Sequence, residues 1–245
     1  MATTMGETKP VGNNGTDTAS VGGYNEGGAM RRFITPGGHP IDTSQPAFPV
    51  FHRKFANPSP LGLLGFAATT FVLSMYNVQA RHIATPNVVL GMALGYGGLV
   101  QLIAGIEEWA CGNTFAATAL SSYGGFWFSF ATLYIPQFAV AAAYTVPGEF
   151  ENAVGIYLVS WSIITFIFFI ASLRSSVALI SLFFFLDITF WCLVGGFLGP
   201  SEKAVKAGGA FGILTAAIAA YTALAGLLTR DTSYFLIPVG DLTRK

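Results

Sequence analysis

The sequence predicts an all-α polytopic membrane protein with six transmembrane helices, and composition and patterning carry that prediction. Of the 245 residues, 53% are hydrophobic and 10% are charged, whereas a soluble domain carries about 25% charged residues. Six long apolar stretches follow a polar N-terminal segment, and most approach or exceed the roughly 20 residues that cross about 30 Å of hydrocarbon as a helix. Apolar and polar residues do not alternate along them, which argues against a transmembrane β-barrel.

Each predicted element follows from local composition. Residues 1–55 are rich in Gly, Thr, Asn and Pro without periodicity, which predicts a disordered N-terminal tail. A six-helix transmembrane domain is expected over residues 56–229, followed by a short tail over 230–245. The six apolar stretches cover residues 61–76, 88–106, 116–143, 154–173, 177–198 and 207–228.

The first helix begins within the sequence NPSPLGLLGF, residues 57–66. Ser59 is a favourable N-cap, and Pro60 suits the first helical position because its missing N–H has no helical partner there. Pro58 biases Asn57 toward extended backbone. This fixed start sets the rotation and depth of Phe66, six residues past Pro60.

Lysine and arginine residues determine the predicted orientation. Six spans place both termini on one side, and that side holds all the Lys and Arg residues except Arg81, Lys203 and Lys206. Positively charged loops remain cytoplasmic, so both termini are predicted to be cytoplasmic. The glycosylation sequon at Asn14 would then not be used.

Polar residues inside the predicted spans are candidate functional groups, because ionisable side chains are costly there. Asp187 lies near the middle of the fifth stretch, either as a proton-accepting or solute-facing group or as a neutral acid bonded to a neighbouring helix. Gln101 and Glu108 are seven residues apart and share a helix face, which suggests a wet path. Interhelical hydrogen bonding is the competing explanation for the uncharged candidates. The remaining polar candidates on the path are Thr69, Thr70, Ser122 and Tyr221.

Small residues recur at four-residue intervals in two of the predicted helices. Gly91 and Gly95 form one such pair and Gly208 and Gly212 another, and Ala219 lies in a similar alanine series. Such spacing lets helix backbones approach closely, within one protomer or between protomers. We also place Ala219 along the expected path.

Motifs for catalysis are missing from the sequence. It contains no Walker loop, G-x-G-x-x-G, G-x-S-x-G or H-E-x-x-H, so neither an enzyme nor an ATP-driven pump is expected. Cys111 and Cys192 lack metal-site spacing, and no metal or cofactor is predicted. A net charge of zero without a basic block gives no reason to expect a nucleic-acid partner. A channel, a secondary transporter or a membrane structural protein remains.

Several sequence blocks resemble the acetate uptake transporters of the GPR1/FUN34/YaaH family, which includes bacterial succinate-acetate permeases and fungal Ato proteins. The blocks are NPSPLGLLGF (57–66), GGLVQLIAGIEEWACGNTF (97–115), SSYGGFW (121–127), GIYLVSW (155–161) and FLIPVG (235–240). The glycine-rich tail is similar in style to the fungal branch. The resemblance implies a ring-shaped homohexamer in the plasma membrane, with a pore for acetate and related short carboxylates in each protomer.

Carried over by motif, the resemblance implies that Phe66, Tyr123 and Leu186 narrow the pore. Gln101 and Glu108 would line the cytoplasmic vestibule, with Asn57 at its mouth. An acid directly after the leucine is not expected across the family, which leaves the role of Asp187 open. Two alternatives to carboxylate transport stay open: ammonia or ammonium export, and a non-transporting membrane sensor or scaffold.

Overall fold

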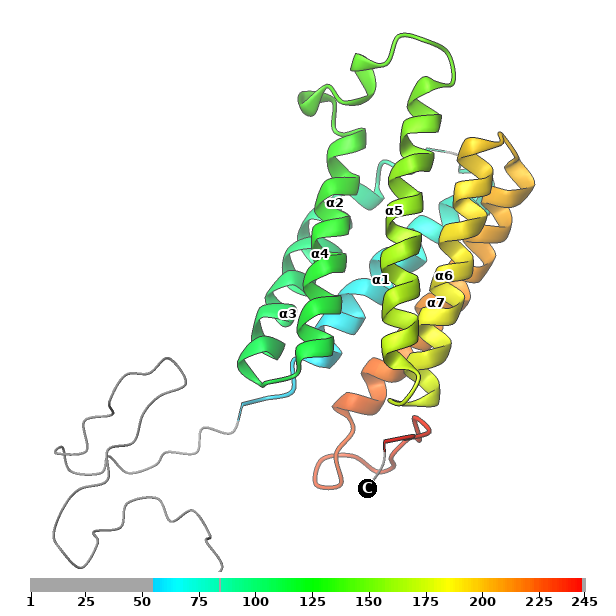
Figure 1. Cartoon of the computed structure of the whole chain (residues 1–245). Helices are drawn as coiled ribbons and strands as arrows, with labels where there is room; N and C mark the ends of the chain where they lie inside the picture. The colour runs from blue at the N-terminus through cyan, green and yellow to red at the C-terminus, as the bar shows by residue number, and fades with distance from the viewer. Residues whose placement is uncertain (1–54, 84, 244–245) are drawn as a thin grey trace, which may run out of the picture. The chain divides into compact units, whose positions relative to one another are not determined.

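The computed structural model describes residues 55–83 and 85–243, and these residues form a bundle of long helices (Figure 1). A π-helical segment, η2, joins α2 to α3 without a break, so the three form one rod. The predicted tail through residue 54 lies outside the described residues. The elements are α1 (Ser59–Asn77), α2 (Val89–Leu94), η2 (Gly95–Val100), α3 (Gln101–Ala110), α4 (Thr114–Tyr134), α5 (Glu149–Ser172), α6 (Val177–Leu198) and α7 (Glu202–Leu227).

Five helical segments of the described chain are long and apolar enough to cross a membrane. They are Ser59–Asn77, Val89–Ala110, Glu149–Ser172, Val177–Leu198 and Glu202–Leu227. The sixth long helix, α4, has 21 residues and several Thr, Ser and Gly residues in its interior. The structure thus confirms an all-α membrane protein built from six long helical segments.

Four predicted boundaries were wrong by four residues or more. The helices α5 and α7 each begin five residues earlier than predicted, at Glu149 and Glu202. The stretch 116–143 is not one helix, because α4 ends at Tyr134 and two 3₁₀ turns, Pro136–Phe138 and Ala141–Ala143, follow it. Pro136 explains the stop, since proline cannot donate within a helix and forces the preceding residue into extended backbone. The second stretch continues past residue 106 to Ala110, which brings Glu108 into the helix.

The start of α1 differs by one residue from the prediction. Pro58 occupies the N-cap position and Ser59 is the first helical residue. The side-chain oxygen of Asn57 accepts a hydrogen bond from the Ser59 backbone N–H at 3.2 Å. Asn57 therefore supplies the side-chain acceptor expected of Ser59, and the Ser59 hydroxyl is left to bond elsewhere.

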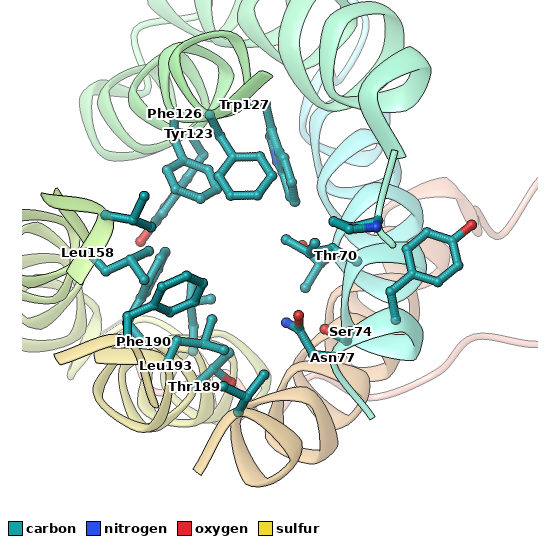
Figure 2. Close-up of a pocket in the computed structure, with 18 of the residues that line it drawn as sticks. Thr70, Ser74, Asn77, Tyr123, Phe126, Trp127, Leu158, Thr189, Phe190 and Leu193 are labelled. Carbon is teal, nitrogen blue, oxygen red and sulfur yellow. The ribbon is translucent and has the colours of Figure 1, made fainter. Parts of the chain in front are cut away.

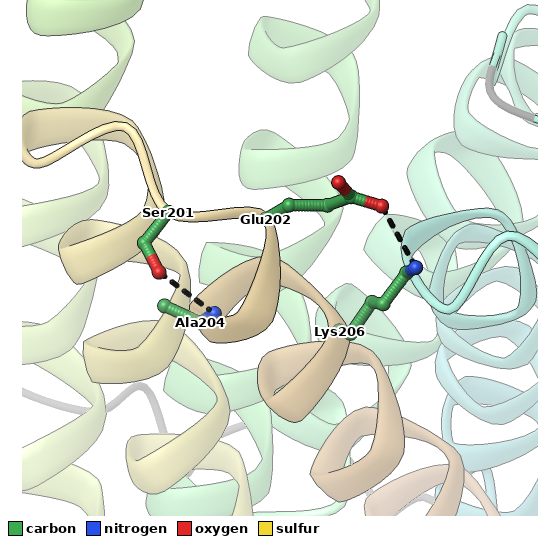
Figure 3. A network of polar contacts seen from close by, with 4 residues as sticks. All are labelled: Ser201, Glu202, Ala204 and Lys206. Atoms are coloured by element: carbon green, nitrogen blue, oxygen red, sulfur yellow. Dashed lines mark hydrogen bonds and ion pairs between the residues drawn. The ribbon is translucent and has the colours of Figure 1, made fainter.

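Polar side chains cap the N-termini of three other helices. Asn113 and Ser176 accept from backbone N–H groups in the first turns of α4 and α6, the usual role of such residues at a helix start. At α7, Ser201 accepts from the Ala204 N–H, and Lys206 pairs with Glu202 at 2.7 Å (Figure 3). That pair is exposed to solvent and contributes little to stability, so the cap and the packing of α7 matter more.

Glycines in α7 let it pack between α6 and α1. An added Cβ at Gly208 would lie 2.9 Å from the side chain of Leu193 on α6, and one at Gly212 would overlap Ser74 on α1. This pair fits the predicted role in close helix approach. By contrast, a Cβ added at Gly91 or Gly95 would have no described atom within 4 Å. Their shared face is thus open in a single chain.

Candidate functional site

Two cavities lie inside the bundle, one on each side of the Phe66 and Tyr123 rings. The upper cavity, on the side where α1 ends at Asn77, has a volume of about 290 Å³. The lower cavity, on the side where α1 begins at Ser59, has a volume of about 610 Å³. Both rings line both cavities, and their centroids are 5.6 Å apart. Leu186 lines the upper cavity. The structure therefore brings together all three residues expected at a constriction, with the two aromatic rings between the cavities.

The two rings are fixed by their surroundings. Phe66 is 4% exposed and Tyr123 is 3% exposed. The Tyr123 hydroxyl is hydrogen-bonded to Oγ1 of Thr165 on α5 at 2.9 Å. The Tyr123 ring also packs against those of Phe168 and Phe183, with centroids 5.8 and 6.4 Å away. The two rings therefore form a mostly apolar partition between the cavities, with the Tyr123 hydroxyl as its polar group.

The upper cavity has an apolar wall and a polar wall (Figure 2). Thr70, Ser74 and Asn77 come from α1, while Phe126 and Trp127 come from α4. Thr70 Oγ1 and Trp127 Nε1 are buried and have no hydrogen-bond partner among the described residues. Leaving a buried polar group unpaired costs about 1–3 kcal/mol. Both groups can therefore act as donors to a solute in this cavity.

The lower cavity lies where α1, α4 and α6 begin. Ser59, Asn113 and Ser176 line it, and so does the cationic side chain of Arg174. Gln101 also lines it and is 0% exposed, yet neither atom of its amide has a partner in the part of the chain that the structure describes. An amide with two N–H donors and one acceptor is suited to bind a carboxyl group.

Seven other predicted path residues lie outside the linings of both cavities. Glu108 is 2% exposed and accepts a hydrogen bond from the Ser59 hydroxyl, so its carboxylate joins α3 to α1 and does not face the vestibule. Asn57 is exposed beside the start of α1. The others are Thr69, Ser122, Asp187, Ala219 and Tyr221.

The physical reasons for these placements differ. The Thr69 hydroxyl bonds the Gly65 carbonyl one turn earlier at 2.8 Å, and Ala219 is fully buried in helix packing. Tyr221 points outward and donates to the Pro238 carbonyl at 2.6 Å. One carboxylate oxygen of Asp187 is buried without a hydrogen-bond partner among residues 55–83 and 85–243. Ser122 is half-buried on α4.

Sequence reasoning did not select Arg174 and Trp127 as site residues. Arg174 contributed only to the predicted orientation, although its position between two predicted spans was a signal that it lies at a pore mouth. Trp127 lies within the SSYGGFW block, but its indole N–H is indistinguishable from core packing without a structure.

Comparisons with known proteins identify relatives in fungi and bacteria. The family model described as "GPR1/FUN34/yaaH family" matches residues 41–244. "Acetate permease A" of Emericella nidulans is 50% identical over 198 residues, 76% of this chain and 66% of that protein. "Ammonia transport outward protein 2" of Saccharomyces cerevisiae is 50% identical over 187 residues, with 76% and 66% covered. The chain thus spans slightly less than two thirds of the length of these fungal relatives.

Bacterial relatives are matched over nearly their whole length. "Succinate-acetate/proton symporter SatP" of Escherichia coli (strain K12) is 34% identical over 193 residues, which are 78% of this chain and 98% of that protein. A solved structure, "Structure of the bacterial acetate channel SatP", aligns with a TM-score of 0.68 at 33% identity. The alignment covers 76% of this chain and all of the bacterial one.

Proposed function

The chain belongs to the GPR1/FUN34/yaaH family, and from this premise we propose that it transports acetate and related short carboxylates through the two cavities and the neck between them. One observation carries the proposal: Phe66 and Tyr123 separate two cavities that each contain buried polar groups without partners among the described residues. A solute on such a path meets Gln101 below the neck and Thr70 and Trp127 above it.

The neck explains how a weak acid is selected. Moving a bare carboxylate through an apolar constriction costs many kcal/mol, whereas a neutral acid loses far less on desolvation. An acid with a pKa near that of Glu, about 4.3, is mostly ionised at neutral pH. Either a proton travels with the solute, or the Tyr123 hydroxyl and the Gln101 amide replace part of its water. Phe66 and Leu186 restrict the size of the solute.

The lower cavity is the one that favours an anion. Arg174 places a positive charge at its edge, and a charged cleft raises the local concentration of oppositely charged solutes. In the orientation we propose, with both termini cytoplasmic, this is the cytoplasmic vestibule. Neither Glu108 nor Asp187 lines it, so no described carboxylate on its wall opposes an incoming acetate.

The proposed assembly is a homohexamer in the plasma membrane. Apolar side chains on the outer faces of α3 and α5 are exposed in the single chain, including Ile103, Ile106, Ile156 and Ile167. Exposed apolar faces of this kind contact lipid or another protomer. The open face that Gly91 of α2 and Gly95 of η2 share fits close approach of a neighbouring helix.

The decisive experiment reconstitutes the purified chain in vesicles and measures labelled acetate uptake and electrical current at two pH values. Acetate flux above that of empty vesicles is expected. A current without proton flux would indicate anion movement, and uptake without current would indicate the acid moving with a proton. Failure to move acetate, succinate or other short carboxylates at either pH would refute the proposed function.

Ammonia export is the second candidate, because one relative at 50% identity is named "Ammonia transport outward protein 2" and a narrow apolar neck can also pass a neutral base. The same vesicles separate the two, since labelled acetate counterflow requires an acetate path. Ammonia flux without acetate counterflow would favour this candidate.

A further inference from the structure

The C-terminal strap, residues 235–243, forms part of the wall of the lower cavity. Ile237, Val239 and Thr243 line that cavity together with Arg174. Ile237 and Val239 are two positions apart and share one face of an extended stretch, and Thr243 follows the turn at Gly240. The strap is therefore one wall of the proposed solute path.

Backbone hydrogen bonds attach the strap to the start of α6. Val177 N–H donates to the Gly240 carbonyl at 2.8 Å and Ala178 N–H to the Val239 carbonyl at 3.0 Å, while Leu242 N–H donates to the Ser175 carbonyl at 2.9 Å. Gly240 has a φ of +68°, a conformation that favours glycine. The strap therefore occupies amide groups that would otherwise be free at the start of α6.

Little apolar burial holds the strap in place. Phe235, Leu236 and Leu242 are 61%, 50% and 47% exposed. The Tyr221 hydroxyl adds one bond, to the Pro238 carbonyl. Segments attached by a few exposed hydrogen bonds open at low free-energy cost, so the strap can separate from α6 without unfolding the bundle.

We propose that the C-terminal strap is a movable cover over the lower cavity, which must leave α6 before a solute exchanges with water on that side. This inference rests on the proposed function, because it assigns the strap to the same path. It predicts that holding the strap on α6 slows transport and that weakening its attachment speeds transport.

The strap can be locked by a disulfide between Ser176→Cys and Asp241→Cys. These residues face each other in an antiparallel bridge. The backbone hydrogen bonds join their neighbours on either side, so the two residues are a non-hydrogen-bonded pair. The Cα atoms of such a pair are about 4.5 Å apart, which is within the range for a disulfide. Cys111 and Cys192 are first replaced by alanine. Oxidation is expected to lower acetate flux at least tenfold relative to the same protein after reduction, and D241C alone serves as the oxidised control.

A labelling measurement tests the strap without relying on transport. Ala116 lines the lower cavity, so the rate at which a water-soluble maleimide labels A116C reports access to it. Labelling should be at least tenfold slower in the oxidised A116C/S176C/D241C chain than in A116C alone. Equal labelling rates, or equal flux before and after oxidation, would overturn the proposal. Absence of acetate flux in every form would count against the proposed function, and the labelling rates would still decide the strap.

Weakening the attachment gives the opposite effect. Tyr221→Phe removes the bond to Pro238, and we expect about fivefold faster labelling of A116C, the effect of losing one ordinary hydrogen bond. Tyr144→Phe is the matched control, because Tyr144 packs against Phe150 far from the strap in sequence. Slower labelling in Y221F, or the same change in both variants, would overturn the cover role.

Discussion

Gln101 gives the sharpest test of the lower cavity, because binding and stability should change in opposite directions. Its amide is fully buried, lines the cavity and has no partner among the described residues. Gln101→Met keeps the length of the side chain and removes the amide. An unpaired buried polar group costs about 1–3 kcal/mol, so the variant without solute should be more stable by about that amount.

Acetate affinity should fall in the same variant. A hydrogen bond to a charged group contributes about 1.5–3 kcal/mol, and every 1.4 kcal/mol is tenfold. The apparent affinity for acetate should therefore weaken by about 10- to 100-fold. Saturation of labelled acetate uptake in vesicles measures affinity, and the melting temperature in detergent measures stability.

Thr69→Val provides the control for this experiment. The Thr69 hydroxyl is also buried but already bonds the Gly65 carbonyl, and its side chain lies outside both cavities. This variant should leave acetate affinity unchanged. If Q101M were less stable than the parent and bound acetate equally well, the amide would be structural and the reasoning would be refuted.

Three further variants test the neck and the mouth. Leu186→Ala should raise the lactate-to-acetate uptake ratio severalfold because it widens the neck. Leu193→Ala, higher in the same cavity, is the control and should not change this ratio. Intact flux with unchanged selectivity in the Leu186 variant would show that Leu186 does not form the neck. Tyr123→Phe should slow acetate about tenfold while Thr165→Val, which keeps the tyrosine hydroxyl, should not, and equal losses would indicate that their mutual bond matters only for structure. Arg174→Gln should reduce uptake about threefold at low ionic strength and less at high salt, where charges are screened; a salt-independent loss would argue against electrostatic attraction.

The arrangement of helices was largely predictable from the sequence, because long apolar stretches have few alternatives in a membrane. The error at the third stretch came from reading hydropathy alone across Pro136, whose effect on the backbone was a stronger signal than the apolar residues after it. The one-residue shift at Ser59 arose because Asn57 competed for the capping role, and sequence cannot rank two such neighbours.

The candidate site was predictable only in part. Gln101 and Glu108 share a helix face as predicted. Gln101 lines the cavity, whereas Glu108 is buried and accepts a hydrogen bond from the Ser59 hydroxyl. The difference depends on what packs opposite each residue. Similarly, Ala219 and Tyr221 lie on a helix that is apolar all round, where periodicity does not distinguish the inward face from the outward one.

The position of α7 against α1 has a consequence for how the protein is made. The close contacts of Gly209 and Gly212 with Ser74, and of Gly226 with Pro60, pair the first helix with the last. Gly209 follows Asn77 by 132 positions, which take about 7–26 seconds to synthesise at about 5–20 residues per second. Throughout that interval Ser74 and Asn77 lack the α7 glycines that finally pack against them, so a nascent chain must keep these polar side chains in or near the membrane until α7 arrives.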